Sequence, residues 1–121
     1  MKMNALLADR MFDFGINAGR GNCIKSLQRI LNVLNRQGKL YDDIDADGGI
    51  GPRTLTALDG FIKARGEEGL NRLMFALTCH QVAYYTEISE ERKDNEEFTY
   101  GWYGRVYQEM PDYAAKLGMC K

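Results

Sequence analysis

The sequence has few of the residues that build metal centres and disulfide frameworks. Its 121 residues include two prolines, one histidine, one tryptophan and three cysteines. A lone histidine gives only a weak zinc signal, even where it follows a cysteine as in Cys79-His80. An odd number of cysteines leaves at least one thiol unpaired. Cys23 and Cys79 fall on apolar helical faces, which predicts buried or unreactive thiols and synthesis in a reducing compartment.

An excess of charge of either sign is also absent. Sixteen basic and seventeen acidic side chains give a formal net charge of −1, whereas nucleic-acid-binding domains usually carry a basic face. No apolar run reaches membrane-spanning length, and the residues after Met1 lack the apolar stretch of a signal peptide. We therefore expect no nucleic-acid partner, no membrane partner and a cytoplasmic location at synthesis.

What the sequence does contain is a strong helical period. Apolar residues recur at intervals of three and four, and glycines or a proline stand where the pattern stops. The expected helices span residues 5–18, 23–34, 52–66, 67–88 and 98–118. Residues 39–45 are too short for a helix and predict at best one strand of a small hairpin. The fold class is therefore mainly α, with a short β-hairpin or loop excursion at residues 39–50, in a single domain of residues 1–121.

The stretch DGGIGPRTLTAL at residues 47–58 organises the chain. Asp47-Gly48-Gly49 favours a turn with positive φ, and Gly51-Pro52 is typical of a helix start. Between them, Ile50 is expected to insert into the core, and Thr54 can bond the loop backbone. The residues expected to shape this loop are Asp47, Gly48, Ile50, Gly51 and Thr54.

The same loop matches the first eight positions of a calcium-binding loop. Asp43, Asp45 and Asp47 alternate, and Gly48 supplies the sharp turn. Thr54 stands at the twelfth position, where such loops need a bidentate glutamate. We therefore expect a solvated acidic turn, with no metal and no cofactor. The charge run SEERKDNEE at residues 89–97 is likewise expected to be a solvated helix end and loop.

The pattern extends well beyond this loop. It resembles the carboxyl-terminal, peptidoglycan-binding portion of family 108 glycoside hydrolases, the lysozyme-like muramidases of phages and secretion systems. The residues that carry the resemblance are Leu27-Gln28, Leu31, Asp47-Gly48, Ile50-Gly51, Thr54, Ala57-Leu58 and Phe61, with Phe12-Asp13-Phe14, Asn17, Gly19, Tyr84-Tyr85, Gly101-Trp102 and Arg105 around them.

The resemblance implies a lysozyme-like helical domain that lacks the family's N-terminal catalytic segment. In that family the acid is a glutamate in an N-terminal Glu-Gly-Gly stretch, and glycoside hydrolysis needs a protonated carboxyl at the leaving oxygen. Glu67-Glu68-Gly69 echoes the motif, but at the wrong place in the chain order. No catalytic residue is therefore assigned, and whether the protein is an enzyme stays open.

Contacts to peptidoglycan glycan strands are expected from aromatic and amide side chains. Tyrosine and tryptophan faces stack on sugar rings, and side-chain amides can bond N-acetyl groups. A helical aromatic stripe is also the usual sign of core packing, so Trp102 has this second interpretation. The candidate glycan-binding residues are Asn17, Gln28, Tyr100, Trp102, Tyr103 and Arg105.

Three hypotheses follow. The first is a peptidoglycan-associated module that resembles a truncated muramidase, in a bacterial or phage lysis or secretion context, with delivery to the cell wall that needs no signal peptide. The second is an active N-acetylmuramidase whose catalytic glutamate lies in another segment or partner. The third is a lysozyme-like scaffold used as a protein-binding inhibitor, for example of phage origin, in which the acidic loop and the run at 89–97 contact a protein partner.

Overall fold

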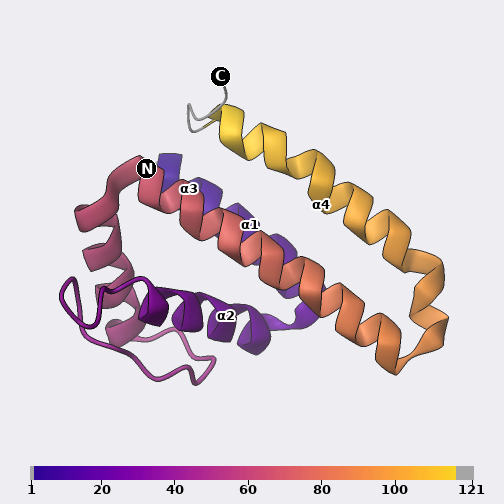
Figure 1. The fold of residues 1–121 in the computed structure, drawn as a ribbon, viewed down its shortest axis with the longest axis horizontal. Helices are drawn as coiled ribbons and strands as arrows, with labels where there is room; N and C mark the ends of the chain where they lie inside the picture. The colour runs from indigo at the N-terminus through magenta and orange to yellow at the C-terminus, as the bar shows by residue number, and fades with distance from the viewer. Residues whose placement is uncertain (1, 117–121) are drawn as a thin grey trace.

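The computed structural model describes the backbone of residues 2–116 and the side chains of residues 5, 7–16 and 18–108. Within these residues all regular structure is helical, as the sequence predicted (Figure 1). The second half of α3 runs through the middle of the molecule, with α4 along one side and α2 along the other (Figure 1). The elements are α1 (Lys2–Ala18), α2 (Arg20–Val33), α3 (Pro52–Glu91), the short 3-10 helix η1 (Lys93–Asn95) and α4 (Glu96–Lys116).

Helix α3 is two helical segments joined at a sharp corner. Gly66 has a φ of 64° and a ψ of −151°, outside the helical region, and glycine tolerates such angles because it has no β-carbon. The prediction of one helix ending near Gly66 and another starting at Glu67 is thereby confirmed. Gly69 closes the inside of this corner, since a β-carbon there would lie 2.1 Å from the Cβ of Arg65.

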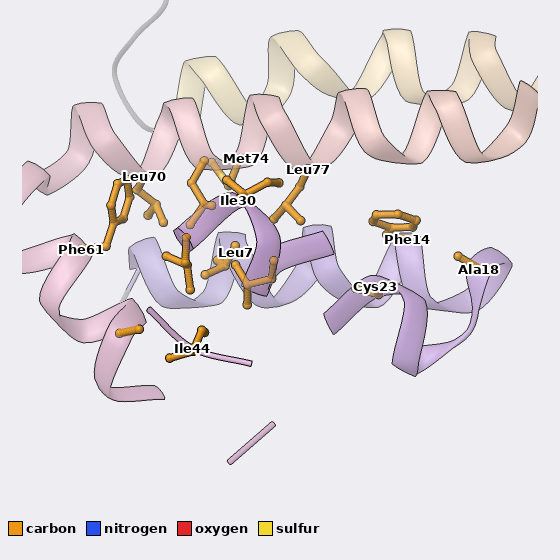
Figure 2. Close-up of a cluster of buried hydrophobic side chains, with 14 residues drawn as sticks. Leu7, Phe14, Ala18, Cys23, Ile30, Ile44, Phe61, Leu70, Met74 and Leu77 are labelled. Carbon is orange, nitrogen blue, oxygen red and sulfur yellow. The ribbon is translucent and has the colours of Figure 1, made fainter. Parts of the chain in front are cut away.

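The hydrophobic core lies where α1, α2 and both halves of α3 meet. Leu7 and Phe14 on α1 lie in one cluster with Met74 and Leu77 on α3 (Figure 2). Ile44 reaches the same core from the loop after α2. Burial of such side chains stabilises a fold by roughly 1.5–3 kcal/mol each, so this cluster is the main source of its stability.

At residues 39–50 the structure decides between the two predicted alternatives, and at the start of α2 it differs from the prediction. The described residues contain no β-hairpin: residues 34–51 form a loop without strands, which leaves the loop interpretation of residues 39–50. Helix α2 begins at Arg20, three residues before the expected start at Cys23, with Gly19 in its N-cap position. The Asn22 amide donates from its Nδ2 to the carbonyl oxygen of Ala18 at 2.7 Å.

Within the described part of the chain, none of the helices has the length and apolar character needed to cross a membrane.

Candidate functional site

A row of amide side chains on α2 holds the long loop in place. Gln28, Asn32 and Asn35 follow one another at i, i+4 and i+7, so they share a face of the helix and its end. Asn32 forms a two-point clamp on Ile44: its Nδ2 donates to the Ile44 carbonyl at 2.8 Å, and its Oδ1 accepts from the Ile44 N–H at 2.9 Å. Asn35 bonds the Asp43 carboxylate and accepts from the Gly38 N–H. The loop therefore obtains from side chains the hydrogen bonds that a strand partner would otherwise supply.

Gln28 is the centre of this row and is only 1% exposed. Its Nε2 lies 3.1 Å from Asp47 Oδ1, 3.0 Å from the Gly49 carbonyl oxygen and 2.9 Å from Thr54 Oγ1. Its Oε1 accepts from the Gly48 N–H at 2.9 Å. The prediction that Gln28 faces a glycan does not fit this geometry, because both ends of the amide are buried and bonded within the protein. Thr54 meets the loop through Gln28 rather than through the loop backbone.

Asp47 and Gly48 shape the turn as expected. The Asp47 Oδ1 accepts from the Gly49 N–H at 2.9 Å, and this bond, followed by that from Gln28, lowers the pKa of the Asp47 carboxyl. Gly48 has a φ of 81°. A β-carbon at Gly48 would also lie 3.0 Å from the carbonyl oxygen of Gly21 on α2. Gly48 is therefore required both for its backbone angle and for close contact with the helix.

Ile50 and Gly51 differ from expectation. The Ile50 side chain is 40% exposed and lies at the edge of an open groove, so the prediction that it inserts into the core is wrong. Ile44 is the loop residue that reaches the core. Gly51 has a φ of −130° and a ψ of −176°, which is extended backbone that any residue adopts. Its place before Pro52 at the start of α3 is as predicted.

Alanine substitutions at the neighbouring glycines Gly48 and Gly49 test this account of the turn. Gly48→Ala is expected to lower the free energy of unfolding by about 1 to 3 kcal/mol, because the new β-carbon meets a left-handed backbone and the Gly21 carbonyl. Gly49→Ala is the matched control: a β-carbon at Gly49 meets only the Asp47 carboxylate, at an ordinary 3.6 Å. Its effect should stay within about 0.5 kcal/mol. Urea unfolding of both variants measures the difference, and equal effects would contradict the account of this turn.

A second polar cluster ties α1 to α3 and α4. Arg10 on α1 is fully buried, and its Nη2 donates to Asp13 Oδ2 at 2.5 Å and to Gln81 Oε1 at 2.6 Å. The other carboxylate oxygen of Asp13, Oδ1, accepts a hydrogen bond from Nη1 of Arg105 on α4. The Gln81 Nε2 donates to the Tyr85 hydroxyl at 2.8 Å, and Arg105 Nη2 reaches the same hydroxyl at 3.2 Å. Arg105, predicted to contact glycan, is thus engaged in joining three helices.

The aromatic residues of α4 divide into packed and exposed groups. Trp102 stacks on the buried Tyr85, with ring centroids 5.0 Å apart, and Phe98 stacks on Trp102 at 6.1 Å. The Tyr103 hydroxyl lies 2.5 Å from Thr86 Oγ1. Tyr100 is 90% exposed. Of the predicted aromatic glycan contacts, the structure therefore places Trp102 and Tyr103 in the packing between α3 and α4 and leaves Tyr100 accessible. The side chain of Asn17 lies outside the described residues.

The metal-ligand patterns do not converge. Within the described residues there is no group of three or more histidine, cysteine, aspartate or glutamate side chains placed to hold a metal ion. Asp43 and Asp47 bond to different amide side chains, Asp43 to that of Asn35 and Asp47 to that of Gln28. The Cys23 thiol is buried, which raises its pKa to about 11. Cys79 is exposed, so of the two predicted alternatives, a buried or an unreactive thiol, the first does not apply to it.

A hollow of about 450 Å³ lies between α2 and the second half of α3, and we call it the polar groove. Its α2 wall carries residues at i, i+3, i+4 and i+7, and its α3 wall is built in the same way, so each helix presents one stripe to the groove. His80 and Ser26 meet in it, with Nδ1 and Oγ 3.1 Å apart. Burial, and then the charge of Arg29, lower the pKa of His80, which keeps the ring neutral at pH 7. The lining residues are Phe14, Asn22, Lys25, Ser26, Arg29, Cys79, His80, Ala83, Tyr84 and Glu87.

The lining of the polar groove can bind a ligand through several kinds of contact. Ser26 and His80 form a hydrogen-bonded pair, and Ser26 lies inside α2, where its backbone N–H is engaged in the helix. The groove carries cations, an amide group and a hydroxyl group beside the partly exposed ring of Tyr84.

A second hollow, the apolar groove, lies between α1, α2 and the first half of α3. Its volume is about 790 Å³, and nearly all of its lining is aliphatic or aromatic. Phe12 on its rim is 72% exposed, and Ile16 and Leu55 are also exposed. Such a surface suits another apolar surface better than a sugar. Neither groove was predicted from the sequence, because each is formed by helices that meet only in the folded chain.

Comparison with protein families adds one finding. Residues 22–107 match a family model described as a predicted peptidoglycan domain. The chain belongs to this family. The match does not assign the chain to family 108 of the glycoside hydrolases. No curated protein matches the chain at a significant level.

Both walls of the polar groove come from this matched segment, apart from Phe14. Much of the apolar groove comes from α1, which precedes the match.

Proposed function

We propose that this protein is a peptidoglycan-binding module that holds cell-wall material in the polar groove. The observation that carries the proposal is the position of the groove, whose two walls lie within the segment that matches the predicted peptidoglycan domain. Its volume lies within the range of about 300–1,000 Å³ that is usual for small-ligand sites. Asn22 and His80 offer hydrogen-bonding groups, and Tyr84 offers a ring face for the apolar side of a sugar.

Sedimentation with insoluble peptidoglycan tests this proposal. The parent chain should sediment with purified sacculi, and Ala83→Trp should reduce the bound fraction severalfold, because an indole at Ala83 fills the groove from its exposed wall. Ala64→Trp is the matched control: Ala64 is also an exposed α3 alanine, and it lies outside the groove. A parent that stays in the supernatant, or equal loss in both variants, would overturn the proposal.

The exposed ring of Tyr100 is a candidate for an additional stacking contact with a glycan strand. It lies on α4, away from the polar groove, and its side chain contributes little to the packing. Tyr100→Ala should therefore leave stability unchanged within about 0.5 kcal/mol, as expected for an exposed surface position. Any effect of this variant on sedimentation can then be assigned to the lost ring.

The muramidase resemblance leads to a prediction about catalysis. The chain alone should cause no loss of turbidity in a peptidoglycan suspension, because general acid–base groups contribute about 10² to 10⁴ in rate and no acid is assigned. Glu67 and Glu68 are exposed at the α3 corner, and Glu68 pairs with Arg72 at 2.7 Å in solvent. Neither lies in the buried, apolar environment that is typical of a glycosidase acid.

The variants Glu67→Gln and Glu68→Gln should therefore behave like the parent in the same assay. Robust lysis by the parent that disappears in one of them would identify that glutamate as the acid. The alternative of a muramidase whose acid comes from another segment or partner predicts the same inert chain, and lysis only when that component is added.

The apolar groove favours a second candidate function, that of an interaction protein. We take its occupant to be a second copy of the chain, because the lining carries one cation, Arg20 on α2, and one anion, Asp59 on α3. In a two-fold dimer each would face its opposite on the partner. Light scattering should then show a dimer at micromolar concentration that Phe12→Ser dissociates and Phe75→Ser, a change at an exposed phenylalanine outside the groove, does not. A monomeric parent would exclude this function.

A further inference from the structure

We propose that the polar groove recognises the carboxylates of peptidoglycan stem peptides, so that the peptide rather than the glycan decides binding. The inference rests on the proposed function and names the part of the polymer that the groove takes. Peptidoglycan consists of neutral sugar rings and short peptides that end in carboxylates. The two parts therefore differ mainly in charge.

The charges of the groove favour the peptide. Lys25 and Arg29 stand at i and i+4 on α2, so both side chains project from the same face into the groove. Both are exposed, and neither takes part in an ion pair within the described residues. The guanidinium of Arg29 has the planar, two-pronged donor geometry that matches a carboxylate. A neutral sugar gives these two cations no partner of opposite charge.

The remaining lining fits a peptide as well. His80 is held by Ser26, and its lowered pKa keeps it uncharged, so it adds hydrogen-bonding capacity without further charge. Glu87 lies on the α3 wall. Stem peptides carry a free amine on their diamino acid as well as carboxylates, and one anion beside two cations complements that pattern. Tyr84 supplies the apolar surface against which short aliphatic side chains pack.

The experiment compares three forms of the same sacculi. The first form is intact, the second has its peptide carboxylates converted to neutral methylamides with a carbodiimide, and the third has lost its phosphate-bearing accessory polymers by acid treatment. We expect binding of the full chain to fall about tenfold or more when the carboxylates are neutralised, since a charge-assisted hydrogen bond is lost. Removal of the phosphate polymers should leave binding unchanged.

Variants identify the residues. Arg29→Gln should weaken binding to intact sacculi about tenfold, and Arg29→Lys should restore part of it, because the charge remains while the fork is lost. Lys25→Gln should act in the same direction. Lys39→Gln removes the same charge from an exposed loop position and is the matched control, for which no change is expected. A soluble stem peptide should compete, and its methyl ester should not.

Each result decides the inference. Equal binding to intact and carboxylate-neutralised sacculi would overturn it and leave the proposed function standing without carboxylate recognition. Loss of binding with the phosphate polymers would show that the bound anion is phosphate, which would also overturn it. A chain that binds none of the three forms would overturn both the inference and the proposed function.

Discussion

Replacing Gln28 with alanine is expected to lower the free energy of unfolding by about 3 kcal/mol or more. The change removes the one amide that bonds Gly48, Gly49 and Thr54 at the same time. Each buried polar group left without a partner costs about 1 to 3 kcal/mol. Since a domain of this kind is stable by only about 5–15 kcal/mol, the loss is a large share of the total.

Gln108→Ala is the matched control for this prediction, because Gln108 is an exposed glutamine on helix α4. Its effect should stay within about 0.5 kcal/mol. Thermal melting should separate the two variants by about ten degrees or more. If Gln28→Ala melted with Gln108→Ala, then the amide would not hold the loop, and the glycan-facing interpretation of Gln28 would return.

Gln28 also shows which features of the loop can be predicted from the sequence and which cannot. The turn at Asp47-Gly48 and the helix start at Pro52 are predictable, because they depend on the angles that glycine and proline allow. The partner that holds the turn is not, since Gln28 lies some twenty residues away and an isolated glutamine indicates neither burial nor exposure. The spacing of Gln28, Asn32 and Asn35 is the one available signal: a polar row at helical spacing next to a buried face.

Ile50 and Ile44 illustrate a different limit. Both are isoleucines in the same polar loop, and propensity does not distinguish them. The structure buries Ile44 because Asn32 clamps its backbone against α2, and it leaves Ile50 partly exposed at the rim of the apolar groove. Which of the two reaches the core thus depends on the path of the loop, which is determined by long-range contacts.

The helices were predictable for the opposite reason. Their apolar residues follow the helical period, and the stripe of Leu7, Met11 and Phe14 does face the core. The two grooves cannot be predicted from the helical period. Ser26 and His80 are 54 residues apart, and only the packing angle between α2 and α3 brings them together. Local period predicts which residues share a helix face, but it does not predict which faces meet.

The buried cluster around Asp13 leads to the second large effect. Asp13→Ala should lower the free energy of unfolding by about 3 to 5 kcal/mol. Its carboxylate accepts from Arg10, which is fully buried, and from Arg105 and Gln81. Without that carboxylate, the Arg10 charge lies inside the protein with its main counter-charge removed, and burial of an uncompensated charge is costly. The loss should therefore affect the joint between α1, α3 and α4 first.

Two further variants separate charge from shape. Asp13→Asn keeps the size of the side chain but not its charge, and its amide nitrogen would face arginine donors, so it should destabilise the fold nearly as much as alanine does. Glu68→Ala breaks an exposed ion pair with Arg72, which contributes about 0.5 kcal/mol or less. Urea unfolding of the three variants measures this order. If Asp13→Asn matched the parent, the packing of the side chain rather than its charge would hold α4 in place, and the Tyr85–Trp102–Phe98 stack would be the principal link between α3 and α4.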